Sequence, residues 1–227
     1  AGLVLMVVAC LVTLQLTGIR VAFTSSPLEW WLSLPVIVLY PLIFAWVSYQ
    51  TATKLAEHKR RLQVMSARDG MTGVYNRRHW ETLLCIEFDH CRRYQRDATL
   101  LIIDIDHFKS INDTWGHDVG DEAILALTRQ LQMTLRSSDV IGRFGGDEFA
   151  VIMCGTPAEN AIAAMSRVHE RLSHLRLSCA PQVILRISVG VAPLTPQISH
   201  YREWLKSADM ALYKAKSAGR NRTEVAA

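Results

Sequence analysis

Two stretches near the N-terminus consist almost entirely of apolar residues. Residues 1–19 carry no charged side chain, and residues 30–53 carry none either. Arg20 and a short polar link with Pro27 separate the two runs. A helix needs about 20 apolar residues to cross a bilayer. The pattern predicts a membrane segment over residues 1–53 with two transmembrane helices, and a buried core hairpin is the alternative.

A basic cluster follows the second apolar run. It consists of Lys54 and the stretch from His58 to Arg61. Basic residues next to a span tend to stay in the cytoplasm. We therefore expect the C-terminal part of the chain to face the cytoplasm, and the cluster can at the same time be a solvated helix face.

Residues 54–68 are predicted to form a helical linker. The stretch from Gln50 to Ala67 contains no Gly or Pro and many good helix formers. Leu55, Leu62 and Met65 lie near heptad spacing, over about two heptads. A short dimeric coiled coil and packing against the following domain are both open interpretations.

From Asp69 to Ala227 the hydrophobic pattern becomes that of a compact domain of 159 residues (227 − 69 + 1). The expected helices are Asn76–Arg96, a helical stretch from about Phe108 that breaks near Gly116 and resumes over Asp118–Leu135, Pro157–Leu175 and Tyr201–Ser217. The expected strands are Ala98–Ile105, Val140–Phe144, Glu148–Met153, Val183–Val191 and Thr223–Ala226. This order predicts an α+β fold in which helices flank a central, mainly antiparallel sheet.

Composition narrows the class of protein. The net charge is +4 and no basic stripe with interleaved aromatic residues is present, which argues against a nucleic-acid partner. Half of the residues are hydrophobic, and the excess lies in the N-terminal part. Because the chain begins with Ala1 inside an apolar run, we expect a fragment of a longer protein.

Cysteine and histidine spacing gives no metal or disulfide signature. The five cysteines are odd in number and contain no CxxC pair, which argues against a disulfide framework or a zinc site and favours reduced thiols. Five histidines show no metal-binding spacing and are interpreted as structural or surface residues: His79, His90, His169, His174 and His200.

The strongest candidate for chemistry is the connection between the strands that end at Phe144 and begin at Glu148. Gly145 and Gly146 stand there, followed by Asp147 and Glu148. Glycine lets the backbone approach a ligand closely, and adjacent acids at a strand end suit Mg²⁺ with a substrate phosphate. An acidic hairpin turn is the plain alternative. In the predicted sheet Asp104 ends a neighbouring strand, so three carboxylates would converge and repel one another unless cations lie between them.

Four ordered blocks of the domain resemble the GGDEF family of diguanylate cyclases. They are the signature Gly145–Phe149, an opening block Asp69–Arg78, a central block Asp104–Asp121 and a C-terminal block Ala208–Asn221. The apolar N-terminal segment with its basic border is similar to the membrane-anchored AdrA type of that family. Met71 and Val74 stand where leucine is commoner in the family, and both positions stay apolar.

The resemblance implies a reaction in which two GTP become cyclic di-GMP and two pyrophosphates. By that resemblance Asp104, the carbonyl of Ile105, Asp147 and Glu148 would hold two Mg²⁺ per half-site, with Mn²⁺ as an alternative. Asp147 would be the proton acceptor or the metal ligand that allows deprotonation, and Glu148 would share the catalytic role. Lys109 would stabilise charge on the phosphates.

The resemblance also implies a set of GTP-binding residues. Guanine carries N1 and N2 donors on one edge, which an amide and a carboxylate can satisfy. Asn112 and Asp121 fit that role, with His117 and Phe108 nearby. The remaining expected contacts to GTP come from Gly145, Gly146, Lys216 and Arg220.

An inhibitory site is implied at Arg136-Ser137-Ser138-Asp139, whose distance before the signature matches the RxxD site of the family. There an arginine would bind the Hoogsteen edge of guanine, and Asp139 would accept hydrogen bonds from N1 and N2. Arg167 falls where a second arginine of the site is expected. We expect feedback inhibition by cyclic di-GMP.

The full prediction is a homodimeric diguanylate cyclase at the bacterial inner membrane, multi-pass, with its GGDEF domain over residues 69–227 in the cytoplasm. Each half-site holds one GTP, so two domains must meet for the reaction. The resemblance links such proteins to biofilm and exopolysaccharide control. The alternative is a noncatalytic receptor for GTP or cyclic di-GMP.

Overall fold

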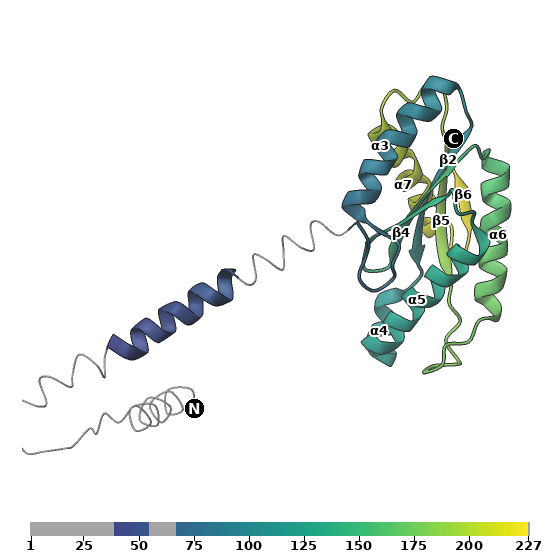
Figure 1. Cartoon of the computed structure of the whole chain (residues 1–227). Coiled ribbons are helices and arrows are strands. Elements are labelled where there is room, and N and C mark those ends of the chain that lie inside the picture. The colour runs from purple at the N-terminus through teal and green to yellow at the C-terminus, as the bar shows by residue number, and fades with distance from the viewer. Residues whose placement is uncertain (1–38, 55–66, 227) are drawn as a thin grey trace, which may run out of the picture. The chain divides into compact units, whose positions relative to one another are not determined.

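The computed structural model describes residues 39–54 and 67–226. The chain divides into two compact units, Ala1–Met65 and Ser66–Ala227. In the first unit residues 39–54 form a helix. The second unit contains a six-stranded sheet with helices on both of its faces (Figure 1).

Membrane-spanning helices are absent from the described residues 39–54 and 67–226. This finding contradicts the predicted transmembrane helices and the predicted multi-pass inner-membrane localisation. The first apolar run and residues 30–38 of the second lie outside the described residues, as does most of the predicted linker.

Within the second unit, the described residues 67–226 form eleven helices and strands. In chain order they are β1 Tyr75–Asn76, α3 Arg77–Tyr94, β2 Ala98–Ile105, α4 Phe108–Trp115, α5 His117–Thr134, β3 Val140–Gly145, β4 Glu148–Cys154, α6 Ala158–His174, β5 Ile187–Pro193, α7 Tyr201–Ser217 and β6 Thr223–Val225. The strands lie in the order β1-β3-β4-β2-β5-β6.

The sheet is mixed, which corrects the predicted mainly antiparallel arrangement. The four central strands pair antiparallel, whereas β1 pairs parallel with β3 and β6 pairs parallel with β5. Both parallel strands are short and lie at the edges, and hydrophobic periodicity does not encode their direction.

Alternation along β2 builds two cores, one on each face of the sheet. Leu101 and Ile103 point into the cluster covered by α5 and α6, while Leu100 and Ile102 point into the cluster with Trp80 of α3. Figure 1 shows α3 and α7 on one face and α5 and α6 on the other. Both faces of β2 are therefore buried, and its two ends are held at fixed positions in the sheet.

Large and small residues fit together where helices meet the sheet. Trp80 of α3 packs over Gly142 of β3, where a Cβ would collide with the indole. The Trp80 indole N–H also donates a hydrogen bond of 3.0 Å to the carbonyl of Val140. On α7, Trp204 donates to the carbonyl of Ala192 at 2.8 Å. These contacts fix α3 and α7 against the strands that carry the candidate site.

Candidate functional site

Carboxylates from two neighbouring strands meet at one end of the sheet. Asp104, next to last in β2, pairs in register with Glu148, the first residue of β4. Asp147 precedes Glu148, and its backbone carbonyl accepts a hydrogen bond of 3.3 Å from the amide of Ile105. The structure therefore brings together Asp104, Ile105, Asp147 and Glu148, the four residues predicted as metal ligands.

The surroundings of these acids favour a bound cation. Burial raises the pKa of Asp104, and the charges of Asp147 and Asp106 raise it further, against the opposing effect of Lys216. Burial also raises the pKa of Glu148, with Asp209 and Asp104 adding to the rise. Neighbouring carboxylates repel one another when all are ionised. A cation that takes oxygen ligands offsets this repulsion and stabilises the ionised forms.

Lys216 supplies the nearest positive charge to Asp104. Its Nζ lies 2.7 Å from Asp104 Oδ2. Lys216 belongs to α7, and Gly190 of β5 allows the backbone of this helix to pack closely on the sheet. The residue predicted to contact phosphate thus forms an ion pair with a predicted metal ligand.

The carboxylate oxygens are not gathered into a single tight shell. In the part of the chain that the structure describes, the group with three metal-ligating atoms within 4.8 Å of one another is a different one, Glu87, His90 and Cys91. Oxygen donors at this site fit Mg²⁺ or Mn²⁺ rather than a thiol-seeking metal.

The glycine turn is held by an arginine that sequence reasoning missed. Arg143 donates two hydrogen bonds to the carbonyl of Gly146, at 2.8 and 3.1 Å, and lies 3.1 Å from Asp69 Oδ1. Gly146 has a φ of 52°, in the left-handed region that favours glycine. Arg143 therefore ties the signature turn to the loop that opens the domain.

A second set of predicted residues lies on α4 and α5. Asn112 and Phe108 of α4 lie against Gly120 of α5, where an added Cβ would collide with the Asn112 amide. Lys109 on α4 is exposed, as are His117 and Asp121 on α5. Gly120 thus makes room for Asn112, and the three polar side chains around it are open to solvent.

Arg220 follows α7 in a constrained loop. Arg220 and Asn221 have φ values of 63° and 47°. The amide of Asn221 donates to Asp106 Oδ2 at 2.9 Å, and Ser188 donates to Asp106 Oδ1 at 2.6 Å. Asp106 is 5% exposed, so it anchors the loop that presents Arg220 to solvent.

The three residues predicted for an inhibitory site line one pocket. Arg136, Asp139 and Arg167 share a cavity of about 470 Å³ between the end of α5, the end of β4 and α6. Asp139 Oδ2 accepts a hydrogen bond of 2.9 Å from the amide of Arg136. Burial raises the pKa of Asp139, against the opposing hydrogen bond and charge of Arg136. The structure brings together the acid and the two arginines that the family resemblance implies for an inhibitory site.

Two buried oxygens stand out within the described residues. Asn112 Oδ1 and Asp139 Oδ1 are the buried side-chain polar atoms that have no hydrogen-bond partner there. Leaving such an atom unsatisfied costs about 1–3 kcal/mol, so each one calls for an explanation. One belongs to the predicted guanine site and the other to the predicted inhibitory site.

Sequence reasoning also missed Asp209 and Arg77. Asp209 is the largest charged contributor to the raised pKa of Glu148, and Arg77 opposes it. Burial raises the pKa of Asp209 as well. Asp209 and Lys216 are seven residues apart on one helix, hence on one face. This seven-residue spacing from Lys216 is the sequence signal that could have identified Asp209 as part of the site.

Comparison with known proteins agrees with this geometry. Residues 66–222 match the family model described as diguanylate cyclase, GGDEF domain. The chain is 85% identical over 227 residues to the probable diguanylate cyclase DgcC of Escherichia coli K12, covering all of this chain and 61% of the relative. It is 36% identical over 159 residues to the diguanylate cyclase DosC of the same organism, covering 69% of this chain and 34% of that protein. The chain thus spans less than two thirds of the length of these relatives.

Solved structures share the fold of the second unit. The GGDEF domain of DgcB from Caulobacter crescentus, in complex with c-di-GMP, has a TM-score of 0.67 and 28% identity, covering 71% of this chain and 96% of that one. The active GGEEF domain of a diguanylate cyclase from Vibrio cholerae has a TM-score of 0.64 and 30% identity, covering 67% and 97%. The chain belongs to the GGDEF-domain family of diguanylate cyclases.

Proposed function

We propose that this domain condenses two GTP into cyclic di-GMP and two pyrophosphates, acting as a homodimer that its product inhibits. The observation that carries the proposal is the pair of unpartnered buried oxygens on Asn112 and Asp139. Each oxygen is an acceptor, and the Watson–Crick edge of guanine offers the N1 and N2 donors. Substrate and product both contain guanine, so both oxygens would gain a partner on binding.

Recognition of GTP begins at Asn112. Its Oδ1 accepts from guanine, while Asp121 on the exposed face of α5 supplies a second acceptor. Lys109 and Arg220 are exposed cations suited to the triphosphate, and the exposed His117 at the start of α5 is a further candidate contact. The glycine turn at Gly145 and Gly146 lets the backbone approach the phosphates.

Charge at the carboxylate cluster is the second element of the proposed mechanism. Asp104, Asp147, Glu148 and the carbonyl of Ile105 would hold two Mg²⁺, or Mn²⁺, which supply charge neutralisation and acidify the attacking 3′-hydroxyl. The raised pKa of Glu148 and Asp104 suits groups whose charge needs a cation partner. Asp147 is half-buried beside them and is the proposed acceptor of the 3′-hydroxyl proton, directly or as a ligand.

Dimerisation follows from the proposed chemistry. Each domain carries one set of GTP-binding residues, and each 3′-hydroxyl must reach the α-phosphate of the other nucleotide. The rate per chain should therefore rise with protein concentration until dimers saturate. A rate per chain that does not change with dilution would contradict the homodimer.

Product inhibition is assigned to the pocket of Arg136, Asp139 and Arg167. The two guanidinium groups suit the acceptors of guanine and the phosphates of cyclic di-GMP, and Asp139 Oδ1 suits the N1 and N2 donors. The c-di-GMP complex of the Caulobacter crescentus domain supports the ligand class. A role of the product in biofilm and exopolysaccharide control stays a prediction of the family resemblance.

The decisive experiment measures cyclic di-GMP by chromatography after incubation of the chain with GTP and Mg²⁺. Asn112→Ala should raise the KM for GTP by at least about tenfold, because a buried acceptor for guanine is lost. Asn112→Asp keeps the acceptor and should retain more activity than Asn112→Ala. Asp113→Ala, an exposed neighbour on α4, is the control and should behave like the parent.

If the parent chain forms no cyclic di-GMP, a different function is favoured. Absence of product at protein concentrations that produce dimers would contradict a cyclase. Binding of GTP or cyclic di-GMP without turnover would then support the noncatalytic receptor.

A further inference from the structure

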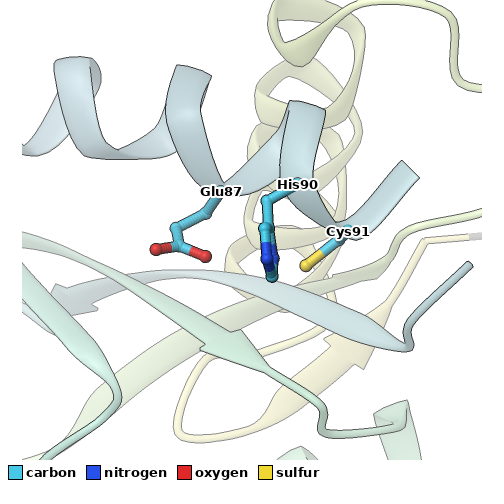
Figure 2. A group of neighbouring side chains, drawn as sticks. All are labelled: Glu87, His90 and Cys91. Carbon is cyan, nitrogen blue, oxygen red and sulfur yellow. The ribbon is translucent and has the colours of Figure 1, made fainter. Parts of the chain in front are cut away.

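Three metal-ligating side chains gather on one helix, far along the sheet from the carboxylates described above. Glu87, His90 and Cys91 of α3 each offer one ligand atom, and these atoms all lie within 4.8 Å of one another. They occupy positions i, i+3 and i+4, which share a helix face. Figure 2 shows all three side chains leaving the helix on the same side.

A fourth candidate ligand reaches this group from the sheet. Cys154, the last residue of β4, places its Sγ 3.2 Å from Glu87 Oε2. The Cys91 thiol interacts with Cys154 as well. Cys154 thus contacts two members of the group, Glu87 and Cys91, from a position 67 residues beyond Glu87. It lies outside the set of three ligand atoms that are within 4.8 Å of one another, so it would complete the site as a fourth ligand from the sheet.

The donor set indicates which metal would bind. Thiolate and imidazole are the ligands that Zn²⁺ prefers, usually four of them in a tetrahedron. Mg²⁺ prefers oxygen and water, so it would not compete for the sulfurs. We propose that Glu87, His90, Cys91 and Cys154 form a structural zinc site that joins α3 to the end of β4.

The burial of the four groups suits a structural role. Cys91 is 1% exposed, Glu87 and Cys154 are half-buried, and His90 lies at the surface. A metal ion would therefore enter the site from the solvent next to His90. The two thiols would bind it from the interior of the domain. The His90 ring packs against Tyr94 with centroids 4.8 Å apart, and one of its nitrogens is among the ligand atoms within 4.8 Å of one another.

Without a metal the same groups form a thiol–carboxylate contact. Burial raises the pKa of the Cys91 and Cys154 thiols, which keeps both protonated. Arg96 adds a positive charge near Cys91. A bound Zn²⁺ would displace the thiol protons, and the Glu87 carboxylate would offset part of the added charge.

The position of the site predicts its effect on the protein. β4 begins at Glu148 beside the glycine turn and ends at Cys154. A metal at Cys154 would pin the far end of this strand to α3 without touching the residues proposed to bind GTP. Zinc should therefore change thermal stability and leave the KM for GTP unchanged.

The test uses the whole 227-residue chain, freed of metal with a chelator and then titrated with Co²⁺ and with Zn²⁺. Cobalt bound to thiolate gives a charge-transfer absorption band, which cobalt bound to carboxylates alone does not give. We expect this band at one Co²⁺ per chain and its loss when Zn²⁺ is added. We also expect one equivalent of Zn²⁺ to raise the unfolding temperature by roughly 5 °C.

Variants separate this site from other metal sites. Cys154→Ser should weaken the band by about half, because Cys91 remains as the single thiolate ligand. His90→Ala, a surface change that leaves the core intact, should weaken Zn²⁺ binding by at least about tenfold. Cys179→Ser and His174→Ala, which are exposed residues of the same types, are the matched controls. Asp104→Asn tests for zinc at the carboxylates.

The outcomes are distinct. A thiolate band that weakens in Cys154→Ser, together with weaker Zn²⁺ binding in His90→Ala and unchanged controls, supports the site. Absence of the band in the parent chain overturns it. A zinc-dependent rise in unfolding temperature that Asp104→Asn removes and Cys154→Ser keeps also overturns it, because the ion then binds at the carboxylates.

Discussion

The two ends of the β3–β4 hairpin carry opposite balances of charge. At the turn end, which we define by Asp104, Asp147 and Glu148, acids outnumber the single lysine that contacts them, Lys216. At the pocket end, defined by Arg136, Asp139 and Arg167, two arginines face one acid. The hairpin thus places an acid-rich site and an arginine-rich site at its two ends.

The opposite balance of charge suggests how one domain can bind related nucleotides in two ways. An acid-rich site binds a triphosphate only with cations between the two sets of negative charges. An arginine-rich site binds phosphates and the acceptors of guanine directly. We therefore expect metal-dependent binding of GTP at the turn end and metal-independent binding of cyclic di-GMP at the pocket end.

The largest effect is expected at the turn end, from Asp104→Asn. In the proposed mechanism this change removes one charged ligand and leaves the cluster less able to hold Mg²⁺, so kcat should fall on the order of 1000-fold. The measurement is the initial rate of cyclic di-GMP formation over a range of Mg²⁺. Affinity for cyclic di-GMP in the presence of a chelator should match the parent. If Asp104→Asn also lowered the affinity for cyclic di-GMP, the pocket end would depend on the carboxylates of the turn end, and the contrast between the two ends would be wrong.

Gly120→Ala should produce the next largest effect, on substrate binding next to the turn end. The added methyl group collides with the Asn112 amide and displaces its buried oxygen. We expect the KM for GTP to rise about 30-fold, in line with the loss of one buried hydrogen bond and some strain. Gly70→Ala is the control, because a Cβ there meets nothing within 4 Å. An unchanged KM in Gly120→Ala would show that Asn112 does not position guanine.

At the pocket end, Arg136→Ala should weaken inhibition by cyclic di-GMP about tenfold, because one charge-assisted contact is lost. The initial rate without added product should stay as in the parent. The measurement is a titration of the initial rate with product, and Arg129→Ala on α5 is the control. Identical inhibition curves for Arg136→Ala and the parent would rule out this pocket as the inhibitory site.

The smallest effect concerns the support of the turn through Asp69. Burial raises the pKa of Asp69, but hydrogen bonds from Thr72 and Arg143 outweigh burial and keep the pKa below its ordinary value. The charged form thus stabilises the fold at pH values above the unfolded pKa, and this stability is lost as pH falls through the lower folded pKa. Asp69→Asn should cost about 1 kcal/mol at neutral pH.

The measurement for Asp69 is urea unfolding at a series of pH values. The difference between parent and Asp69→Asn should shrink on acidification and vanish below the folded pKa. A difference that grows as pH falls would contradict the direction given for Asp69.

Most of the fold could be predicted from local patterns, and the exceptions depend on distant partners. The limits of β2 and of α7 agree with expectation because apolar runs and helix formers are local signals. The strand expected from Val183 begins only at Ile187, since Ile187 pairs with Ile105, the last residue of β2. The two-residue β1 depends on pairing with Gly142 and Arg143, which no local pattern shows.

In the candidate sites, too, residues with a local sequence signal could be predicted, and residues that depend on distant partners could not. Asp104 and Glu148 could be paired in advance because both stand at ends of recognisable strands. Arg143 was missed because its role depends on Asp69, 74 positions away, as well as on the nearby Gly146. Asp209 was missed because Glu148, whose pKa it raises, lies far away in sequence. Cysteine spacing argued against a zinc site, and Cys154 lies more than sixty residues beyond Glu87, so only the folded chain brings the two together.

Trp80 gives the molecule an optical reporter of its hairpin. Its indole N–H bonds to Val140, the residue after Asp139, and its ring meets the ring of Phe144 edge-on with centroids 4.9 Å apart. Phe144 adjoins the glycine turn, so this fluorophore contacts β3 beside both ends of the hairpin. Its emission should report movement at either end, and replacing the other tryptophans with phenylalanine would isolate that signal.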